Sequence, residues 1–215
     1  MQTATTREDG KEGADRDRTS LVSAVAISLR EKYVAKCNAL EEDHLDQAIE
    51  QKLEGVPWLS PFLPSSPEAM CSFAQLADVR SDDVILDVGC GDGRVLVTMA
   101  KVFGCRGIGI DISQACVESA EDISKAEGVF DLLSWHCADA TRPGVADELG
   151  LATITVVFVY AYPTLLANLK ELLTQLRRRG ARVFTLQYHI VGEGWEASRS
   201  CDTEPGQRLY PALVP

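Results

Sequence analysis

Short apolar runs alternate with helical stretches along the central part of this 215-residue chain. The runs are rich in β-branched and aromatic residues and read as buried strands, and the stretches between them have the periodicity of helices. A strand–helix–strand order of this kind requires a parallel sheet with helices on both faces, the doubly wound α/β class. The predicted strands are Val84–Val88, Arg106–Ile110, Leu132–Cys137, Ile154–Tyr160 and Arg182–His189.

Helices and a terminal hairpin are expected around these strands. Ser66, Pro67 and Glu68 indicate a helix start, because a serine cap, a proline at the first helical position and an early acid favour an N-terminus. Two short strands around a turn at 204–206 are expected to form an antiparallel hairpin at the sheet edge. The helices predicted between the strands are Gly93–Phe103, Gln114–Glu127, Ala146–Leu149 and Pro163–Arg179. The apolar face of the helix after Ser66 is predicted to be Met70, Phe73, Leu76 and Ala77.

The N-terminal part of the chain has a different character. Residues 1–20 are polar and aperiodic, which predicts a disordered tail. The spacing from Ser23 to Glu54 predicts one helix, an accessory element within residues 21–60 that either packs on the main domain, residues 61–215, or acts as a substrate-selecting lid. Six acids and one lysine lie between Glu41 and Glu54, which makes this stretch a candidate wall for a basic substrate.

Charge and cysteine usage exclude several classes of protein. A formal net charge of −11 argues against tight binding to a nucleic-acid backbone. The apolar run Leu21–Leu29 has about half the length that spans a bilayer. The first residues mix acids with bases, unlike a transit or signal peptide. The seven cysteines form no CxxC pair, so we expect no disulfide framework, no metal site and a cytoplasmic setting.

The most informative motif is the segment DVGCGDGR at Asp87–Arg94, between a predicted buried strand and a helix. Gly89, Gly91 and Gly93 allow a tight turn and close approach to a ligand. The N-terminus of the following helix offers unpaired N–H groups to an anionic group. Asp111 ends the next strand, where an acid accepts hydrogen bonds from ribose hydroxyls.

The spacing of these residues distinguishes between two cofactor classes. Dinucleotide-binding folds use GxGxxG, whereas the glycines here read GxGxG and Asp87 precedes them. Asp87 can bind an ammonium group, directly or through water. An acid for an amine, N–H groups for a carboxylate and an acid for a ribose together describe S-adenosylmethionine, which we therefore expect as the cofactor.

On these motifs the sequence resembles the class I S-adenosylmethionine-dependent methyltransferases. GIGIDIS at 107–113 looks like the family's second motif, with Asp111 as the ribose acid and Ile112 beside the adenine. HCADAT at 136–141 looks like the third, in which Asp139 would bond the adenine amino group and Ala140 would line the ring. The resemblance implies a Rossmann-like, mostly parallel seven-stranded sheet of order 3-2-1-4-5-7-6.

A narrower resemblance is to the small protein-lysine methyltransferases related to the ATP synthase c-subunit lysine N-methyltransferase. The segment PFLPSSPEAM at 61–70 is similar to a loop that closes over the cofactor in that group, so Phe62 and Ser66 become candidates to touch it. Cys90 would contribute its backbone N–H and no nucleophile. A mitochondrial address is the alternative that this resemblance implies, although this chain lacks the N-terminal membrane segment of the mitochondrial members.

Methyl transfer needs an acceptor site over the carboxyl ends of the central strands. Tyr160 and Tyr162 end the predicted fourth strand there, and their rings or hydroxyls could hold or orient an amine. Packing alone also accounts for both tyrosines. The leading hypothesis is a protein-lysine N-methyltransferase with a basic, lysine-bearing protein substrate. The alternatives are a small-molecule methyltransferase and a cofactor-binding partner protein without catalysis.

Overall fold

The strands form one sheet in the order β3-β2-β1-β4-β5-β7-β6 in a computed structural model that describes residues 8–53, 62–192, 194–195 and 200–211. Neighbours from β3 to β5 are parallel, and β7 is antiparallel to β5 and β6. The predicted strand order and C-terminal hairpin are therefore confirmed. The strands are β1 (Val84–Val88), β2 (Arg106–Asp111), β3 (Leu133–Cys137), β4 (Val156–Val159), β5 (Arg182–Leu186), β6 (Cys201–Glu204) and β7 (Gln207–Pro211).

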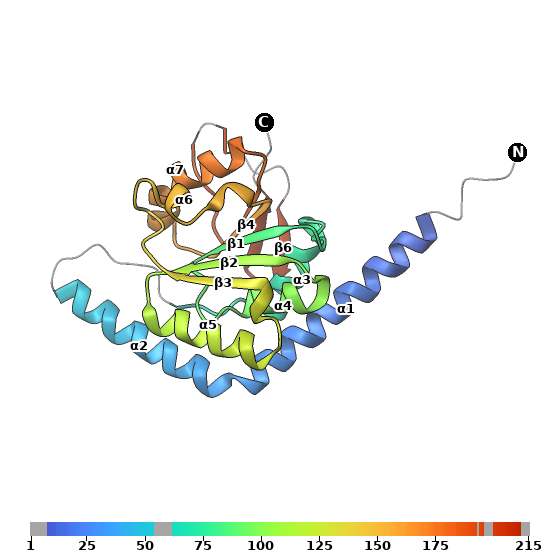
Figure 1. Ribbon diagram of the computed structural model, residues 1–215, viewed down its shortest axis with the longest axis horizontal. Coiled ribbons are helices and arrows are strands. Elements are labelled where there is room, and N and C mark those ends of the chain that lie inside the picture. The colour runs from blue at the N-terminus through green and yellow to red at the C-terminus, as the bar shows by residue number, and fades with distance from the viewer. Residues whose placement is uncertain (1–7, 54–61, 193, 196–199, 212–215) are drawn as a thin grey trace, which may run out of the picture.

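Helices cover both faces of the sheet (Figure 1). One face carries α3 (Pro67–Leu76), α4 (Arg94–Phe103) and α5 (Gln114–Ala126). The other carries α6 (Val145–Glu148) and α7 (Pro163–Arg178). Two short 3₁₀ turns, η1 (Phe130–Leu132) and η2 (Leu151–Thr153), precede β3 and β4.

The core has two halves because successive residues of a strand point to opposite faces of the sheet. In β4, Phe158 belongs to the cluster with α3, where its ring centroid lies 4.8 Å from that of Phe73. Val157 belongs to the cluster with α7. Ser66 caps α3 as predicted, with its Oγ accepting from the N–H of Ala69 at 3.1 Å. Leu76, predicted on the buried face, is instead 38% exposed.

The N-terminal region forms two helices, α1 (Glu8–Lys32) and α2 (Val34–Leu53), and not the one predicted. The break at Tyr33 lets the pair bend around the outside of the α4–α5 layer (Figure 1). The disordered tail predicted for residues 1–20 is also wrong for residues 8–20, which are helical, and residues 1–7 lie outside the described part. Extending a helix that is already docked costs little, because each added residue gains a hydrogen bond without a new nucleus.

The apolar run Leu21–Leu29 is a packing stripe. Val22, Ala26 and Leu29 are 0%, 2% and 4% exposed and join the core cluster that contains α3 and α4. Leu21 and Ile27 are 49% and 44% exposed on the other side of the helix. In the part of the chain that the structure describes, no helix has the length and apolar character to cross a membrane.

Glu127 fastens the α1–α2 junction to the main domain. Its side chain is 9% exposed and accepts from Lys32 Nζ at 2.6 Å, from Tyr33 Oη at 2.8 Å and from Lys101 Nζ. Burial by itself would raise the pKa of Glu127, but the hydrogen bonds from Lys101, Lys32 and Tyr33 lower it to about 2. One carboxylate thus joins α1, the junction residue and α4.

From this junction α2 runs antiparallel to α5, toward the edge of the sheet at which the parallel strands end. Lys36 Nζ lies 2.8 Å from Asp122 Oδ2, in the middle of α5. Burial and the charge of Asp111 raise the pKa of the Cys116 thiol to about 12, and the charge of Asp43 contributes to the same shift. Asp43 therefore lies near the start of α5, where Cys116 is. The helix continues for residues 44–53, a further rise of about 15 Å.

We predict that Glu127→Gln destabilises the fold by about 2 kcal/mol at neutral pH, because the amide cannot replace a carboxylate that accepts from two ammonium groups. A folded-state pKa below the unfolded value stabilises the protein above about pH 5, and this contribution is lost as the pH falls toward 2. The difference between variant and wild type in chemical denaturation should therefore shrink on acidification.

Glu121→Gln is the matched control for this prediction. It breaks an exposed pair with Lys125 within α5, the helix that Glu127 caps at its C-terminus, and such a pair contributes little to stability. Equal effects of the two substitutions at neutral pH would contradict the role assigned to Glu127.

Candidate functional site

The predicted site residues gather at the carboxyl edge of the parallel strands. Asp87 lies near the end of β1, Asp111 ends β2, and Asp139 follows β3. Tyr160 and Tyr162 follow β4 at the same edge. The N–H of Ala138 donates to the backbone oxygen of Asp111 at 2.9 Å and so joins the ends of β2 and β3.

The loop after β1 is held against the end of β2 by backbone hydrogen bonds. The N–H groups of Gly89 and Cys90 both donate to the oxygen of Ile110, at 2.8 and 3.1 Å. Gly89, Gly91 and Gly93 all have positive φ, which explains the alternate glycines. A Cβ at Gly89 would meet nothing within 4 Å, so the loop has open space at this point.

Asp87 is a buried carboxylate, 3% exposed. Among the described residues, none donates a hydrogen bond to its side chain. Burial, together with the charges of Asp111 and Asp92, raises the pKa of Asp87 well above its usual range. A cationic ligand group beside Asp87 would reverse this effect, because an opposite charge favours the ionised form.

Asp111 is oriented by two backbone donors. The N–H of Gly91 donates to Oδ2 at 2.8 Å, and the N–H of Ser113 donates to Oδ1 at 2.9 Å. The carboxylate is therefore fixed at the carboxyl edge. Ile112, the predicted adenine neighbour, is 50% exposed directly after it. This combination suits a ligand with hydroxyls next to an apolar ring.

Asp92 and Arg94 form a buried ion pair that sequence reasoning missed. Asp92 accepts from Arg94 Nε at 2.9 Å and from Nη2 at 2.6 Å, and the two residues are 2% and 8% exposed. Arg94 Nη2 also donates to the Sγ of Cys37 at 3.1 Å. The glycine loop is thus in polar contact with α2. The sequence signal for this ion pair was the presence of Asp92 and Arg94, two residues apart, at the end of the motif DVGCGDGR.

Two aromatic rings fill the space that the glycines leave. A Cβ on Gly91 would lie 2.5 Å from the ring of Phe62, so this ring packs on the glycine loop. A Cβ added to Gly93 or to Gly109 would likewise collide with the ring of Trp135. Trp135 Nε1 donates to Ser124 Oγ at 3.2 Å and so ties α5 to the sheet.

The remaining candidates differ in how they are placed. Asp139 is exposed, and its Oδ1 accepts from the N–H and hydroxyl of Thr141, while Ala140 is buried. Burial, then Asp111 and Asp87, raises the pKa of the Cys90 thiol well above its usual value, which disfavours the thiolate form. The hydroxyl of Ser66 caps α3, and no described contact joins it to the glycine loop.

A cavity of about 320 Å³ lies beside Tyr160 and Tyr162. Its lining also includes Gln187, Tyr188 and Gln207, and we call it the tyrosine cavity. The ring centroids of Tyr162 and Tyr188 lie 5.7 Å apart. No carboxylate or ammonium group is among its described lining residues, so it suits a side chain that enters uncharged or is held by aromatic faces.

Gln187 has an unusual backbone. Its φ is +72°, and the N–H of Tyr188 donates to the oxygen of Leu186 at 2.9 Å, which closes a γ-turn. A non-glycine residue in this conformation stores strain of about 1–3 kcal/mol, and such residues concentrate at functional sites. The turn ends β5 at Leu186, whereas the sequence predicted that this strand would continue to His189.

Comparison with known proteins agrees with this geometry. The profile of a family described as the ANTKMT methyltransferase domain matches residues 87–199, more than half of the chain. A protein-lysine N-methyltransferase of Saccharolobus islandicus is 26% identical over 147 residues, 68% of this chain and 86% of that protein. The ribosomal protein L11 methyltransferase of Erwinia tasmaniensis is 29% identical over 46% of this chain and 31% of its own length.

A solved relative carries the cofactor product. The RNA methyltransferase of Salinibacter ruber, crystallised with S-adenosyl-L-homocysteine, has a TM-score of 0.60 and 28% identity. The match covers 71% of this chain and 94% of that one. The present residues fit the same group. The buried Asp87 carboxylate, which accepts no hydrogen bond from the described residues, is open to an amine, and the oriented Asp111 carboxylate is open to ribose hydroxyls. S-adenosylmethionine is the cofactor.

We predict that Asp111→Ala weakens S-adenosylmethionine binding by about 10- to 100-fold in calorimetric titration, because charge-assisted hydrogen bonds contribute roughly 1.5–3 kcal/mol. Asp111→Asn should also bind weakly, since its amide N–H₂ would face one of the two backbone donors that now meet carboxylate oxygens. Asp131→Asn, which neutralises an exposed acid before β3, is the control. Unchanged affinity in Asp111→Ala would contradict the assignment.

Proposed function

The chain belongs to the ANTKMT methyltransferase domain family, and from this premise we propose that it methylates the side-chain amine of lysine in a protein substrate. The coarser activity, S-adenosylmethionine-dependent methyl transfer, follows from the family and the fold. The observation that carries the finer proposal is the tyrosine cavity, which opens beside the carboxyl edge and has aromatic walls. The similarity to a protein-lysine N-methyltransferase supports it.

The reaction is a displacement at carbon. The bound cofactor supplies a methyl group on a positively charged sulfur, and the amine nitrogen forms the new N–C bond while the S–C electron pair stays on sulfur. In our proposal Asp87 holds the cofactor's ammonium group, Asp111 its ribose hydroxyls, and Gly89, Cys90, Gly91 and Gly93 approach it through their backbone. Ile112, Asp139 and Ala140 would surround the adenine, and Phe62 and Ser66 would close the loop over it.

The acceptor amine must arrive deprotonated, with its lone pair in line with the bond that breaks. We assign its orientation to Tyr160 and Tyr162, whose rings and hydroxyls lie at the carboxyl edge. Removal of the amine from water in an uncharged cavity favours loss of its proton, because burial disfavours the ammonium form. These two tyrosines are therefore the proposed catalytic residues.

The course of α2 supports a basic protein as the substrate. Glu41, Glu42 and Asp43 are exposed on the part of α2 that approaches the carboxyl edge. The helix continues beyond them through residues 44–53, in which the sequence places further acids. A negative surface of this kind attracts a lysine-rich partner and raises its rate of association.

The test of the function is incubation of the protein with S-adenosylmethionine carrying a tritiated methyl group and a cell lysate, followed by mass spectrometry of the labelled material. We expect methyl-lysine in a labelled protein, and Asp111→Ala should reduce the label strongly at cofactor concentrations below the Kd of the variant. A label found only in small molecules or in RNA would overturn the lysine assignment while leaving the methyltransferase activity intact.

The role of the acidic helix has its own prediction. A triple variant with Glu41→Gln, Glu42→Gln and Asp43→Asn should raise the KM for a basic protein acceptor by about 3- to 10-fold at low salt, because long-range attraction is lost. The increase should disappear at high salt, and the affinity for S-adenosylmethionine should not change.

A charge-matched control uses three exposed acids of α6 and α7, with Asp147→Asn, Glu148→Gln and Glu171→Gln. It removes the same charge from another part of the surface. Equal increases in KM in both triple variants would show that net charge alone acts, and would contradict a role for α2.

A further inference from the structure

We propose that the β6–β7 hairpin sets the geometry of methyl transfer, with Thr203 and Gln207 as positioning residues for the hydroxyl of Tyr160. The proposal rests on the function proposed above and deepens it. It gives a role to a segment that lies outside the glycine motif and more than 100 residues after it in the chain.

The first step is a hydrogen-bonded relay from the hairpin to the tyrosine. Thr203 Oγ1 donates to Gln207 Oε1 at 3.1 Å, and Gln207 Nε2 donates to Tyr160 Oη at 3.2 Å. The oxygen of an amide only accepts and its nitrogen only donates. In this arrangement the Gln207 oxygen faces Thr203 and the nitrogen faces Tyr160, so the phenol oxygen is the acceptor in the second bond.

The second step is the attachment of the hairpin to the end of β5. The N–H of Gln187 donates to the oxygen of Arg208 at 2.7 Å, and Gln187 Nε2 donates to the oxygen of Gly206 at 3.3 Å. Gln187 is the residue in the strained γ-turn. The turn thus holds the tip of the hairpin at the tyrosine cavity, which Gln187, Gly206, Gln207 and Tyr160 all line.

The third step joins the relay to the reaction. A nucleophile must meet the methyl group within a narrow range of distance and angle, and a displacement of about 1 Å can cost a factor of 100 in rate. A phenol whose oxygen accepts from a fixed amide presents its ring and hydroxyl in one direction. Loss of the relay should therefore lower kcat, with little effect on cofactor binding.

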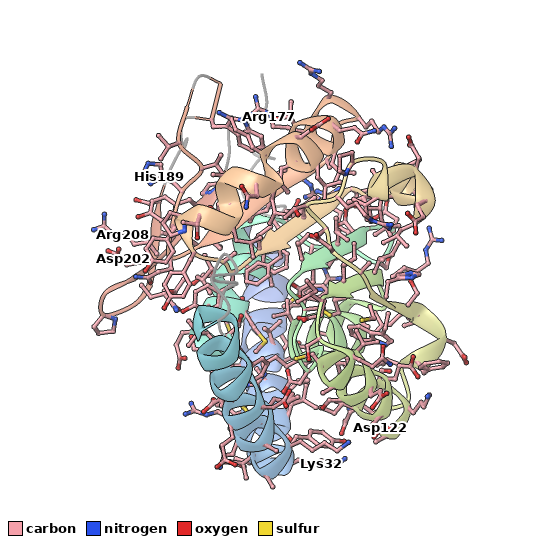
Figure 2. The ribbon with its side chains drawn as sticks, turned by 90° about the vertical axis from the view of Figure 1, so that its left-hand side faces the viewer. Lys32, Asp122, Arg177, His189, Asp202 and Arg208 are labelled. Carbon is pink, nitrogen blue, oxygen red and sulfur yellow. The ribbon has the colours of Figure 1, made fainter. Side chains whose placement is uncertain are left out.

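The hairpin also offers an internal control. Asp202 and Arg208 form an exposed ion pair, with 2.7 Å between Oδ1 and Nε, and the Asp202 side chain takes no part in the relay. Figure 2 shows this pair together on one flank of the molecule, well away from Lys32 at the end of α1 and Asp122 in α5. Asp202→Asn breaks the pair and leaves the relay in place.

The test is a double-mutant cycle on the full chain, with poly-L-lysine as acceptor and formation of S-adenosylhomocysteine and methyl-lysine as readouts. Gln207→Leu and Tyr160→Phe should each lower kcat by about tenfold or more without changing the affinity for S-adenosylmethionine. The double variant should be no slower than Tyr160→Phe, because Gln207 acts through the hydroxyl. Asp202→Asn should match wild type.

Two conservative changes separate positioning from a merely structural role. Thr203→Val should lower kcat and Thr203→Ser should retain it, since only serine keeps the donor. Thermal midpoints of all variants are measured alongside, and a loss of kcat that only follows the midpoint would overturn the proposal.

The outcomes distinguish this inference from the proposed function. Independent, multiplicative effects of Gln207→Leu and Tyr160→Phe, or full activity of Tyr160→Phe, would overturn the relay and leave lysine methylation standing. A wild-type protein that methylates no lysine would overturn the proposed function. The cycle would then be measured on the acceptor labelled in the lysate, where coupling between the two residues still supports the relay and its absence overturns it.

Discussion

The contact on which the site depends is the carboxylate of Asp111 between two backbone N–H groups. Gly91 donates to one oxygen and Ser113 to the other, so the loop after β1 and the start of α5 are held by one side chain at the end of β2. Only a chain with a parallel β1–β2 pair places these groups together, because both strands must end at the same edge. The parallel sheet and the cofactor site are therefore consequences of the same topology.

Much of the fold could be predicted because it follows from local pattern. The parallel strands, the Ser66 cap and the C-terminal hairpin each have a signal within a few residues. The predictions were wrong at positions where tertiary packing determines the local structure. The break at Tyr33 has no proline or glycine, and it follows from the contacts of Lys32 and Tyr33 with Glu127, far along the chain. Leu76 fits the helical stripe in sequence, but it lies at the end of α3 and remains exposed.

Some residues of the candidate site could likewise be predicted from local sequence, and others could not. The glycine motif and its two acids could be read from the sequence, because spacing alone places them at adjacent strand ends. The ion pair of Asp92 with Arg94, and its contact with Cys37, required the position of α2, which no local pattern gives. The positive φ of Gln187 had no signal at all, since glutamine rarely adopts it and the hairpin that holds it is distant in sequence.

The burial of α1 bears on what counts as a unit of this protein. Val22, Ala26 and Leu29 share one core cluster with Phe73 and Met99, so the hydrophobic interior continues across the boundary that composition suggests near residue 60. A piece that began at the methyltransferase motifs would expose that interior to water. Helix α1 and the sheet therefore share one hydrophobic core, and the segment that looks dispensable in the sequence shields the α3–α4 side of that core from water.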